Sequence, residues 1–221
     1  FSSVHFSGTS GALLYALTGQ DLCKVDTGNK SVSQPIVTGV TQYRLYREND
    51  IAFAAVRDDK KVAGVYLDGK EHIVKNFAVS DDVMVDITEY FSHFYLAITH
   101  MNHIEIIKDP TEVSQVSAGR AYASFDMPYR PTWIDFGSSG RFLIVGSGRA
   151  YDKYDLETDE HVAVNPDEVN AAQAAPTWLD DYYLVDNPTG TVRIYEFDGK
   201  NRHTIAAAEP SLPAFLTENG K

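Results

Sequence analysis

Tyr195-Glu196-Phe197-Asp198-Gly199 is a short strand-like run that ends in an aspartate and a turn, and the pattern occurs four more times in the chain. The other copies are Cys23-Lys24-Val25-Asp26-Thr27-Gly28, Val65-Tyr66-Leu67-Asp68-Gly69, Ile106-Ile107-Lys108-Asp109-Pro110 and Lys153-Tyr154-Asp155-Leu156-Glu157. Their aspartates are separated by 42, 41, 46 and 43 residues. Repeats of this length that contain several short strands are typical of β-propeller blades.

Two further markers precede these aspartates in a constant order. One is a strongly apolar run, found at 13–17, 51–55, 94–98, 142–146 and 182–185. A near-continuous apolar run is typical of a strand covered on both faces, as the second strand of a blade is. The other is Pro131-Thr132-Trp133-Ile134-Asp135, nearly repeated at Pro176-Thr177-Trp178-Leu179-Asp180 and similar in form to Pro213–Lys221. We interpret these segments as innermost strands.

We therefore predict an all-β chain that forms a β-propeller of four-stranded antiparallel blades. Five blades are recognisable within a single domain of residues 1–221, at about 2–37, 41–78, 83–116, 132–164 and 177–206. Residues 211–221 resemble the first strand of a sixth blade or a closing strand. A β-sandwich with regular turns is the alternative, and two sheets facing each other would favour it.

The repeated aspartates are expected to close tight turns. Aspartate accepts backbone N–H bonds two residues further on, and Gly69 and Gly199 directly follow two of the five. A calcium role is disfavoured because the aspartates lie one per blade and form no Asp-x-Asp-x-Asp-Gly loop.

Composition limits the function classes. The chain has 221 residues, 43% of them hydrophobic, and a formal net charge of −12. Nucleic-acid binding and attraction to an anionic membrane both need a basic surface, so we predict that the chain does neither. The single cysteine, Cys23, cannot form an intramolecular disulfide, and no apolar run is long enough to span a membrane.

Several short motifs resemble TolB-type and related WD-repeat-like propellers. Pro213–Lys221 resembles their Pro-x-Phe-Ser-Pro-Asp-Gly-Lys element, and Tyr154-Asp155-Leu156-Glu157-Thr158 resembles their third strand. The Ser-Pro-Asp element is absent, and no Gly-His and Trp-Asp pair marks a true WD repeat. The resemblance implies a propeller that binds partners in the periplasm or at a bacterial cell surface. We accordingly expect an exported protein, anchored by a segment outside this chain.

The connector from Val116 to Pro131 is the longest and holds the predicted binding site. Its candidate ligand-binding residues combine aromatic rings with arginines, a composition suited to protein or glycan recognition. They are Arg120, Tyr122, Phe125, Tyr129 and Arg130. The alternative is that these aromatic rings fold back over the blade edges.

Histidines 93, 100 and 103 cluster in the third blade, where His100-Met101-Asn102-His103 could hold a metal in a turn. No third ligand has convincing spacing, so we predict a solvated hairpin, no metal and no cofactor.

Catalysis is the second hypothesis. A carbohydrate-active hydrolase would use channel carboxylates, for which Asp86, Asp135 and Asp180 are candidates. Their recurrence at equivalent repeat positions favours a structural role. No nucleophile elbow or phosphate-binding glycine loop occurs. We predict a non-enzymatic ligand- or protein-binding scaffold without catalytic residues. A propeller that positions a partner enzyme domain remains a third possibility.

Overall fold

The computed structural model describes residues 2–7, 13–46, 49–57, 62–67, 70–77, 83–112, 121–164, 174–187 and 190–209. Every regular element in these ranges is a β-strand, and none of them contains a helix that could cross a membrane. The predicted all-β class is confirmed for this part of the chain. Two compact units are present, Phe1–Asp126 and Met127–Lys221. The single continuous domain stays a prediction.

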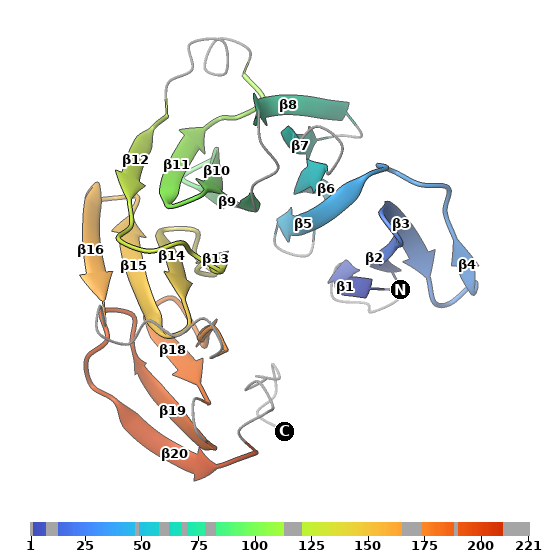
Figure 1. Cartoon of the computed structure of the whole chain (residues 1–221). Coiled ribbons are helices and arrows are strands. Elements are labelled where there is room, and N and C mark those ends of the chain that lie inside the picture. The colour runs from blue at the N-terminus through green and yellow to red at the C-terminus, as the bar shows by residue number, and fades with distance from the viewer. Residues whose placement is uncertain are drawn as a thin grey trace. The chain divides into compact units, whose positions relative to one another are not determined.

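The first unit contains three antiparallel sheets of four strands each, and every sheet uses strands that follow one another in the chain (Figure 1). The first sheet consists of β1 (Ser2–Ser7), β2 (Leu13–Thr18), β3 (Asp21–Asp26) and β4 (Ser31–Val32). The second consists of β5 (Val40–Tyr46), β6 (Asn49–Arg57), β7 (Val62–Leu67) and β8 (Lys70–Asn76). The third consists of β9 (Met84–Tyr90), β10 (His93–His100), β11 (His103–Lys108) and β12 (Ala123–Asp126).

The second unit contains two sheets with the same strand order. The fourth sheet consists of β13 (Trp133–Phe136), β14 (Phe142–Ser147), β15 (Ala150–Asp155) and β16 (Glu160–Val164). The fifth consists of β17 (Thr177–Trp178), β18 (Tyr183–Asp186), β19 (Thr191–Glu196) and β20 (His203–Ala207). Residues 211–221, predicted to begin a sixth blade or to close the ring, lie outside the described residues.

Neighbouring sheets of the first unit share apolar cores. The core between the first and second sheets contains Tyr15, Leu17, Leu22, Val37, Val40, Tyr43, Ala55 and Tyr66. The core between the second and third sheets includes Ala54, Val56, Val65, Val85, Ile87, Leu96 and Ile98. Hydroxyl groups add polar links, since Tyr43 donates to the Tyr15 carbonyl at 2.7 Å and Tyr46 donates to Glu89 at 2.7 Å. Each sheet thus relies on its neighbour to cover an apolar face, as predicted.

The fourth and fifth sheets are joined in the same way. Their shared core contains Ile144, Tyr151, Val164, Leu184 and Tyr195, with Trp133, Trp178 and Phe197 packed against it. The Tyr151 hydroxyl donates to the Phe197 carbonyl at 2.9 Å. Hydrophobic burial and a partly buried hydrogen bond therefore both stabilise this pair of sheets.

A charged cluster also links these two sheets. Asp186, at the end of β18, accepts two hydrogen bonds from Arg193, at 3.0 Å from Nε and 2.7 Å from Nη2. It accepts a third at 3.2 Å from Nε of Arg149, in the turn that joins β14 to β15. The carboxylate side chain is only 2% exposed. Two guanidinium groups therefore share one buried negative charge.

The second strands of the blades are buried as predicted. All six residues of β14 are buried, and so are the five consecutive residues from Tyr95 to Thr99 of β10. Both faces of such a strand are covered, so the side chains that point to either face are apolar. This explains the unbroken apolar runs in the sequence.

The predicted end of the third blade at residue 116 is wrong. The fourth strand of this sheet is β12, which pairs with β11 so that Ala123 lies opposite Ile106 and Phe125 opposite Ile104. The predicted connector from 116 to 131 therefore contains a strand. Hydrogen-bond pairing with β11, rather than the local sequence pattern, decides which residues form the edge strand. Residues 113–120 lie outside the described residues.

The turn-closing role is confirmed for three of the repeated aspartates. In each case a carboxylate oxygen accepts a hydrogen bond from a backbone amide two or three residues further on. Asp26 accepts from Asn29 at 2.9 Å, Asp155 accepts from Glu157 at 2.9 Å, and Asp198 accepts from Lys200 at 3.0 Å. Asp109 differs, since its own backbone is left-handed with a φ of 48°. Asp68 lies outside the described residues.

Asp155 is expected to make the fold sensitive to acid. Burial alone raises its pKa, but hydrogen bonds from Arg141 and from the Glu157 amide outweigh burial and hold the pKa below its usual value. A carboxyl group with a lowered folded-state pKa stabilises the fold above its unfolded pKa of about 3.9 and loses this effect as the pH falls through the folded value. Urea unfolding should therefore shift to lower urea below about pH 4.

Asp155→Asn removes this titration, so its unfolding midpoint should fall less with acid than that of the parent chain. Glu160→Gln, which removes an exposed carboxylate from the same hairpin, is the control. A pH dependence that is the same in all three proteins would show that Asp155 does not carry the effect.

Candidate functional site

The hairpin between β9 and β10 turns within two residues, Phe91 and Ser92. Both have left-handed backbones, with φ angles of 47° and 62°. Two-residue hairpin turns of this kind favour Asn and Gly, because a larger side chain crowds the backbone there. A phenylalanine in this conformation is a steric outlier, and such outliers gather at functional sites.

The Phe91 side chain adds a second cost, because the residue is 75% exposed. Its ring packs edge-on against Tyr90, with centroids 4.5 Å apart and planes at 65°. An exposed ring forgoes the free energy that burial of an aromatic side chain provides. Backbone strain and solvent exposure therefore both disfavour phenylalanine at this turn.

Tyr95 and Tyr122 form a second aromatic pair in this sheet. Their centroids are 5.4 Å apart with planes at 78°, and the Tyr122 amide donates to the Ile106 carbonyl at 2.7 Å. Tyr95 is buried, and its burial together with the nearby Tyr122, Asp109 and Tyr90 raises its pKa. Its phenol therefore keeps its proton at neutral pH and can donate a hydrogen bond.

Charged groups lie beside these rings. His93 Nδ1 is 2.8 Å from an Asp109 carboxylate oxygen, and the Lys108 ammonium lies 6.0 Å from the centre of the Tyr95 ring. The Glu112 amide donates to the Asp109 carbonyl at 2.9 Å, which places a second, exposed acidic residue in the same turn. We name the whole group the Phe91 patch: Tyr90, Phe91, His93, Tyr95, Lys108, Asp109 and Tyr122.

The predicted ligand-binding residues are divided between the two units. Tyr122 belongs to the Phe91 patch and is 42% exposed. Phe125 lies on β12 and is half-buried opposite Ile104. Arg120 lies outside the described residues. Tyr129 and Arg130 belong to the second unit.

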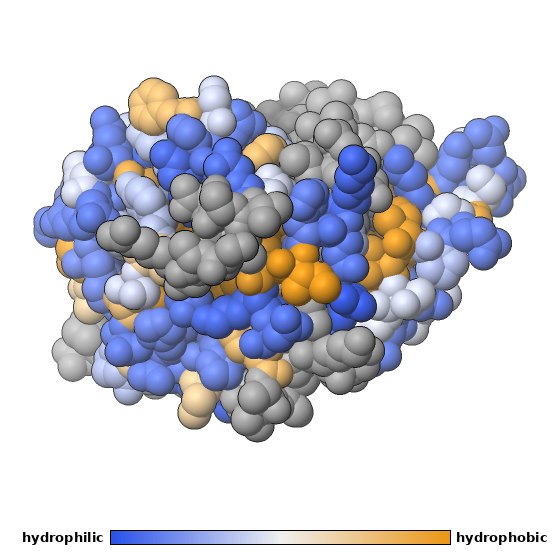
Figure 2. Space-filling view, turned by 90° about the horizontal axis from the view of Figure 1, so that it is seen from above, coloured by the Kyte–Doolittle hydropathy of each residue, from blue (hydrophilic) through white to orange (hydrophobic). Residues whose placement is uncertain are grey.

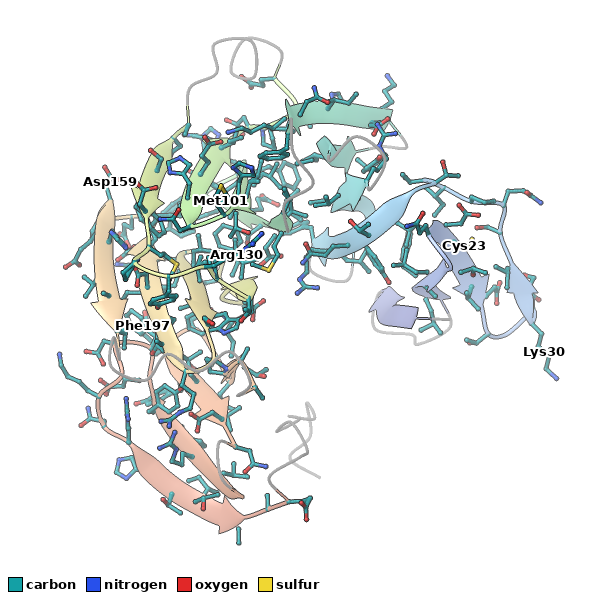
Figure 3. The ribbon with its side chains drawn as sticks, viewed as in Figure 1. Cys23, Lys30, Met101, Arg130, Asp159 and Phe197 are labelled. Carbon is teal, nitrogen blue, oxygen red and sulfur yellow. The ribbon has the colours of Figure 1, made fainter. Side chains whose placement is uncertain are left out.

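In the second unit, Tyr129 and Arg130 precede β13 (Figure 3 labels Arg130). The Tyr129 hydroxyl is buried and has no hydrogen-bond partner among the described residues. Burial, and then the negative charge of Asp152, raise its pKa. Asp152 itself pairs with His161, whose Nε2 is 2.6 Å from a carboxylate oxygen. Tyr129 is therefore a neutral hydrogen-bond donor in the second unit.

The clustered histidines have protein partners. His100 stacks on Phe77 with ring centroids 4.8 Å apart. His103 faces two carboxylates, with Nδ1 2.6 Å from Asp126 and Nε2 3.5 Å from Glu105. In the described part of the chain, no three His, Cys, Asp or Glu side chains are grouped so that they could hold a metal ion.

The three candidate channel carboxylates have different surroundings. Asp86, in the first unit, is buried and accepts the amide of the next residue at 2.9 Å. Asp180, in the second unit, accepts the amides of Tyr182 and Tyr183 at 2.7 and 2.8 Å, which are the bonds of a turn-closing aspartate. Asp135 lies half-buried on β13. The hydrolase interpretation stays a prediction.

Sequence reasoning did not identify Phe91, although a signal was present. Tyr90 and His93 flank a two-residue gap between apolar runs, and this gap contains neither Gly nor Asn nor Asp. A hairpin that short normally needs one of those residues. Their absence could have marked the turn as strained.

Comparison with known proteins supports the fold. Neither a family model nor a curated protein matches the sequence. Among solved structures, dihydro-heme d1 dehydrogenase NirN in complex with DHE is similar, with a TM-score of 0.56 and 11% identity over 97% of this chain and 48% of that one. Hsv2 of Kluyveromyces lactis is similar with a TM-score of 0.60 and 12% identity, over 93% of this chain and 63% of that one.

Both neighbours are β-propellers, so this chain has the β-propeller fold that its repeats predict. It spans about half the length of the NirN chain and less than two thirds of the Hsv2 chain. Identity at this level shows the fold alone.

Proposed function

We propose that this propeller is a non-enzymatic binding or scaffold module that holds a protein partner at the Phe91 patch. The observation that carries the proposal is Phe91 itself, 75% exposed on a left-handed turn. A residue that costs stability in these two ways and also packs against another aromatic ring is retained most simply because a partner covers it.

The chemistry of the patch suits a protein interface. A tyrosine side chain supplies a large contact area, and binding immobilises only two of its dihedral angles. Tyrosine is enriched among the interface residues that contribute most of the binding free energy. The buried Tyr95 packs against the exposed Tyr122, and Tyr90 packs against the exposed Phe91. Figure 2 shows a face of the molecule on which hydrophilic residues predominate and hydrophobic residues form smaller areas.

Phe91→Asn is expected to stabilise the fold and abolish partner binding. Asn tolerates the left-handed turn, so the free energy of unfolding should rise by about 0.5–1 kcal/mol. Proteins that bind the parent chain through this patch should be lost from the variant. Urea unfolding measures the first effect, and affinity capture from an extract of the source organism measures the second.

Met101→Asn is the matched control. Met101 (labelled in Figure 3) occupies the two-residue turn at the other end of β10, has a φ of 58° and is 52% exposed. The same substitution there should stabilise the fold similarly and leave capture unchanged. Equal capture by the parent chain and Phe91→Asn would contradict the proposal.

The cellular setting belongs to the same proposal. The short TolB-like motifs support an exported bacterial propeller in the periplasm or at the cell surface. A partner from that compartment is therefore the first to test, and a glycan there is the other ligand class to include in the capture experiment.

A further inference from the structure

The described residues at the Phe91 patch and its next turn carry more carboxylates than lysines or arginines. Asp109 and Glu112 lie in one turn, the Asp109 carboxylate is 2.8 Å from His93 Nδ1, and Lys108 is the one lysine or arginine of the patch. The whole chain follows the same balance, with 31 acidic and 19 basic residues. Such a surface attracts cations and repels acidic partners.

Aromatic rings of this chain contact positively charged side chains of the same chain. The Lys108 ammonium lies 6.0 Å from the Tyr95 ring centre, and the Arg141 guanidinium lies 4.8 Å from the Phe142 ring centre. Positive charge over a ring face is attracted by the negative potential of that face. The exposed ring of Phe91 offers the same kind of surface to a molecule from outside.

We infer that the partner presents arginine or lysine side chains to the Phe91 patch. This inference rests on the proposed function and specifies its partner. A guanidinium group stacks on the Phe91 ring, and the carboxylates of Asp109 and Glu112 balance its charge. Arginine fits better than lysine because its planar group stacks and is weakly hydrated. Lys108 opposes the incoming charge.

The test measures binding of dye-labelled repeat peptides to the full chain. An arginine–glycine peptide is compared with glutamine–glycine and glutamate–glycine peptides of equal length. The arginine peptide should bind best and lose affinity with added salt. Phe91→Asn should weaken its binding by about two- to thirtyfold, the range for loss of one cation–π contact. Lys108→Met should strengthen it by about two- to fivefold.

Met101→Asn should bind the arginine peptide like the parent chain, which controls for the turn substitution. Three results would each overturn the inference: no preference for arginine, unchanged binding in Phe91→Asn, or weaker binding in Lys108→Met. If Phe91-dependent capture of a protein persists while the arginine preference is absent, the proposed function stands and this inference fails. If both are absent, both fail.

Discussion

Replacing Gly146 with alanine is expected to remove about 3 kcal/mol or more from the free energy of unfolding of the second unit. A Cβ atom at this position would lie 2.4 Å from the Ala150 carbonyl oxygen, 2.5 Å from the Trp133 ring and 2.7 Å from Tyr151 Cβ. The ring cannot move aside freely, because Trp133 Nε1 donates to the Gly148 carbonyl at 3.0 Å. Both the backbone of β15 and an anchored ring would have to shift.

Gly137→Ala is the control for this substitution, since Gly137 also faces a tryptophan. Its added Cβ would meet the Trp178 ring at 3.5 Å, an ordinary contact, so the loss should stay below about 1 kcal/mol. Both tryptophans of the chain, Trp133 and Trp178, lie in the second unit, so their fluorescence during urea unfolding reports on that unit. Equal midpoints for the two variants would refute the steric argument.

Asp186→Ala should cost about 3–5 kcal/mol, the range seen when one member of a buried ion pair is removed. The carboxylate is 2% exposed, and the Arg149 and Arg193 side chains are 12% and 20% exposed. Without Asp186, two guanidinium groups would remain largely buried with no shared counter-charge. Urea unfolding followed by tryptophan fluorescence measures the loss.

Asp198→Ala provides the contrast for this prediction. Asp198 pairs with Lys200, whose side chain is 77% exposed, and accepts the Lys200 amide in its turn, so its removal should cost about 1–2 kcal/mol. A triple variant with Asp186→Leu, Arg149→Met and Arg193→Met should recover most of the stability, because it removes the charges together. If Asp186→Ala loses no more stability than Asp198→Ala, the buried cluster is not what holds these sheets together.

The fold was predictable from the sequence because the pattern that specifies it is local and repeated. Strand alternation, the apolar second strand and a turn-closing aspartate each depend on a few neighbouring residues, as Phe142–Ser147 and Asp155 illustrate. Each blade repeats them, so the weak signal of one blade is reinforced by the others. Four consecutive strands form each of the five sheets of the described residues.

The third sheet contains a strand that the local sequence does not predict. Ala123–Asp126 is a short edge strand with weak strand preference, and it is a strand because it pairs with Ile104 and Ile106 of β11. Such pairing is a property of the sheet rather than of the four residues. The local sequence pattern therefore predicts a loop at this segment.

The candidate site was only partly predictable, for a similar reason. Residue type in a long connector predicts Tyr122, and it belongs to the Phe91 patch. Residue type does not predict Phe91, because exposure and backbone conformation are its distinguishing features and residue type alone reports neither.

The order of strands within the sheets also bears on how the protein is made. Each sheet is completed by strands that are consecutive in the chain, so none waits for a segment translated much later. A nascent chain that has emerged from the ribosome as far as Val164 already holds every hydrogen-bonding partner of its first four sheets. We therefore expect blades to form in the order of synthesis, and within each unit a finished blade serves as the template against which the next one folds.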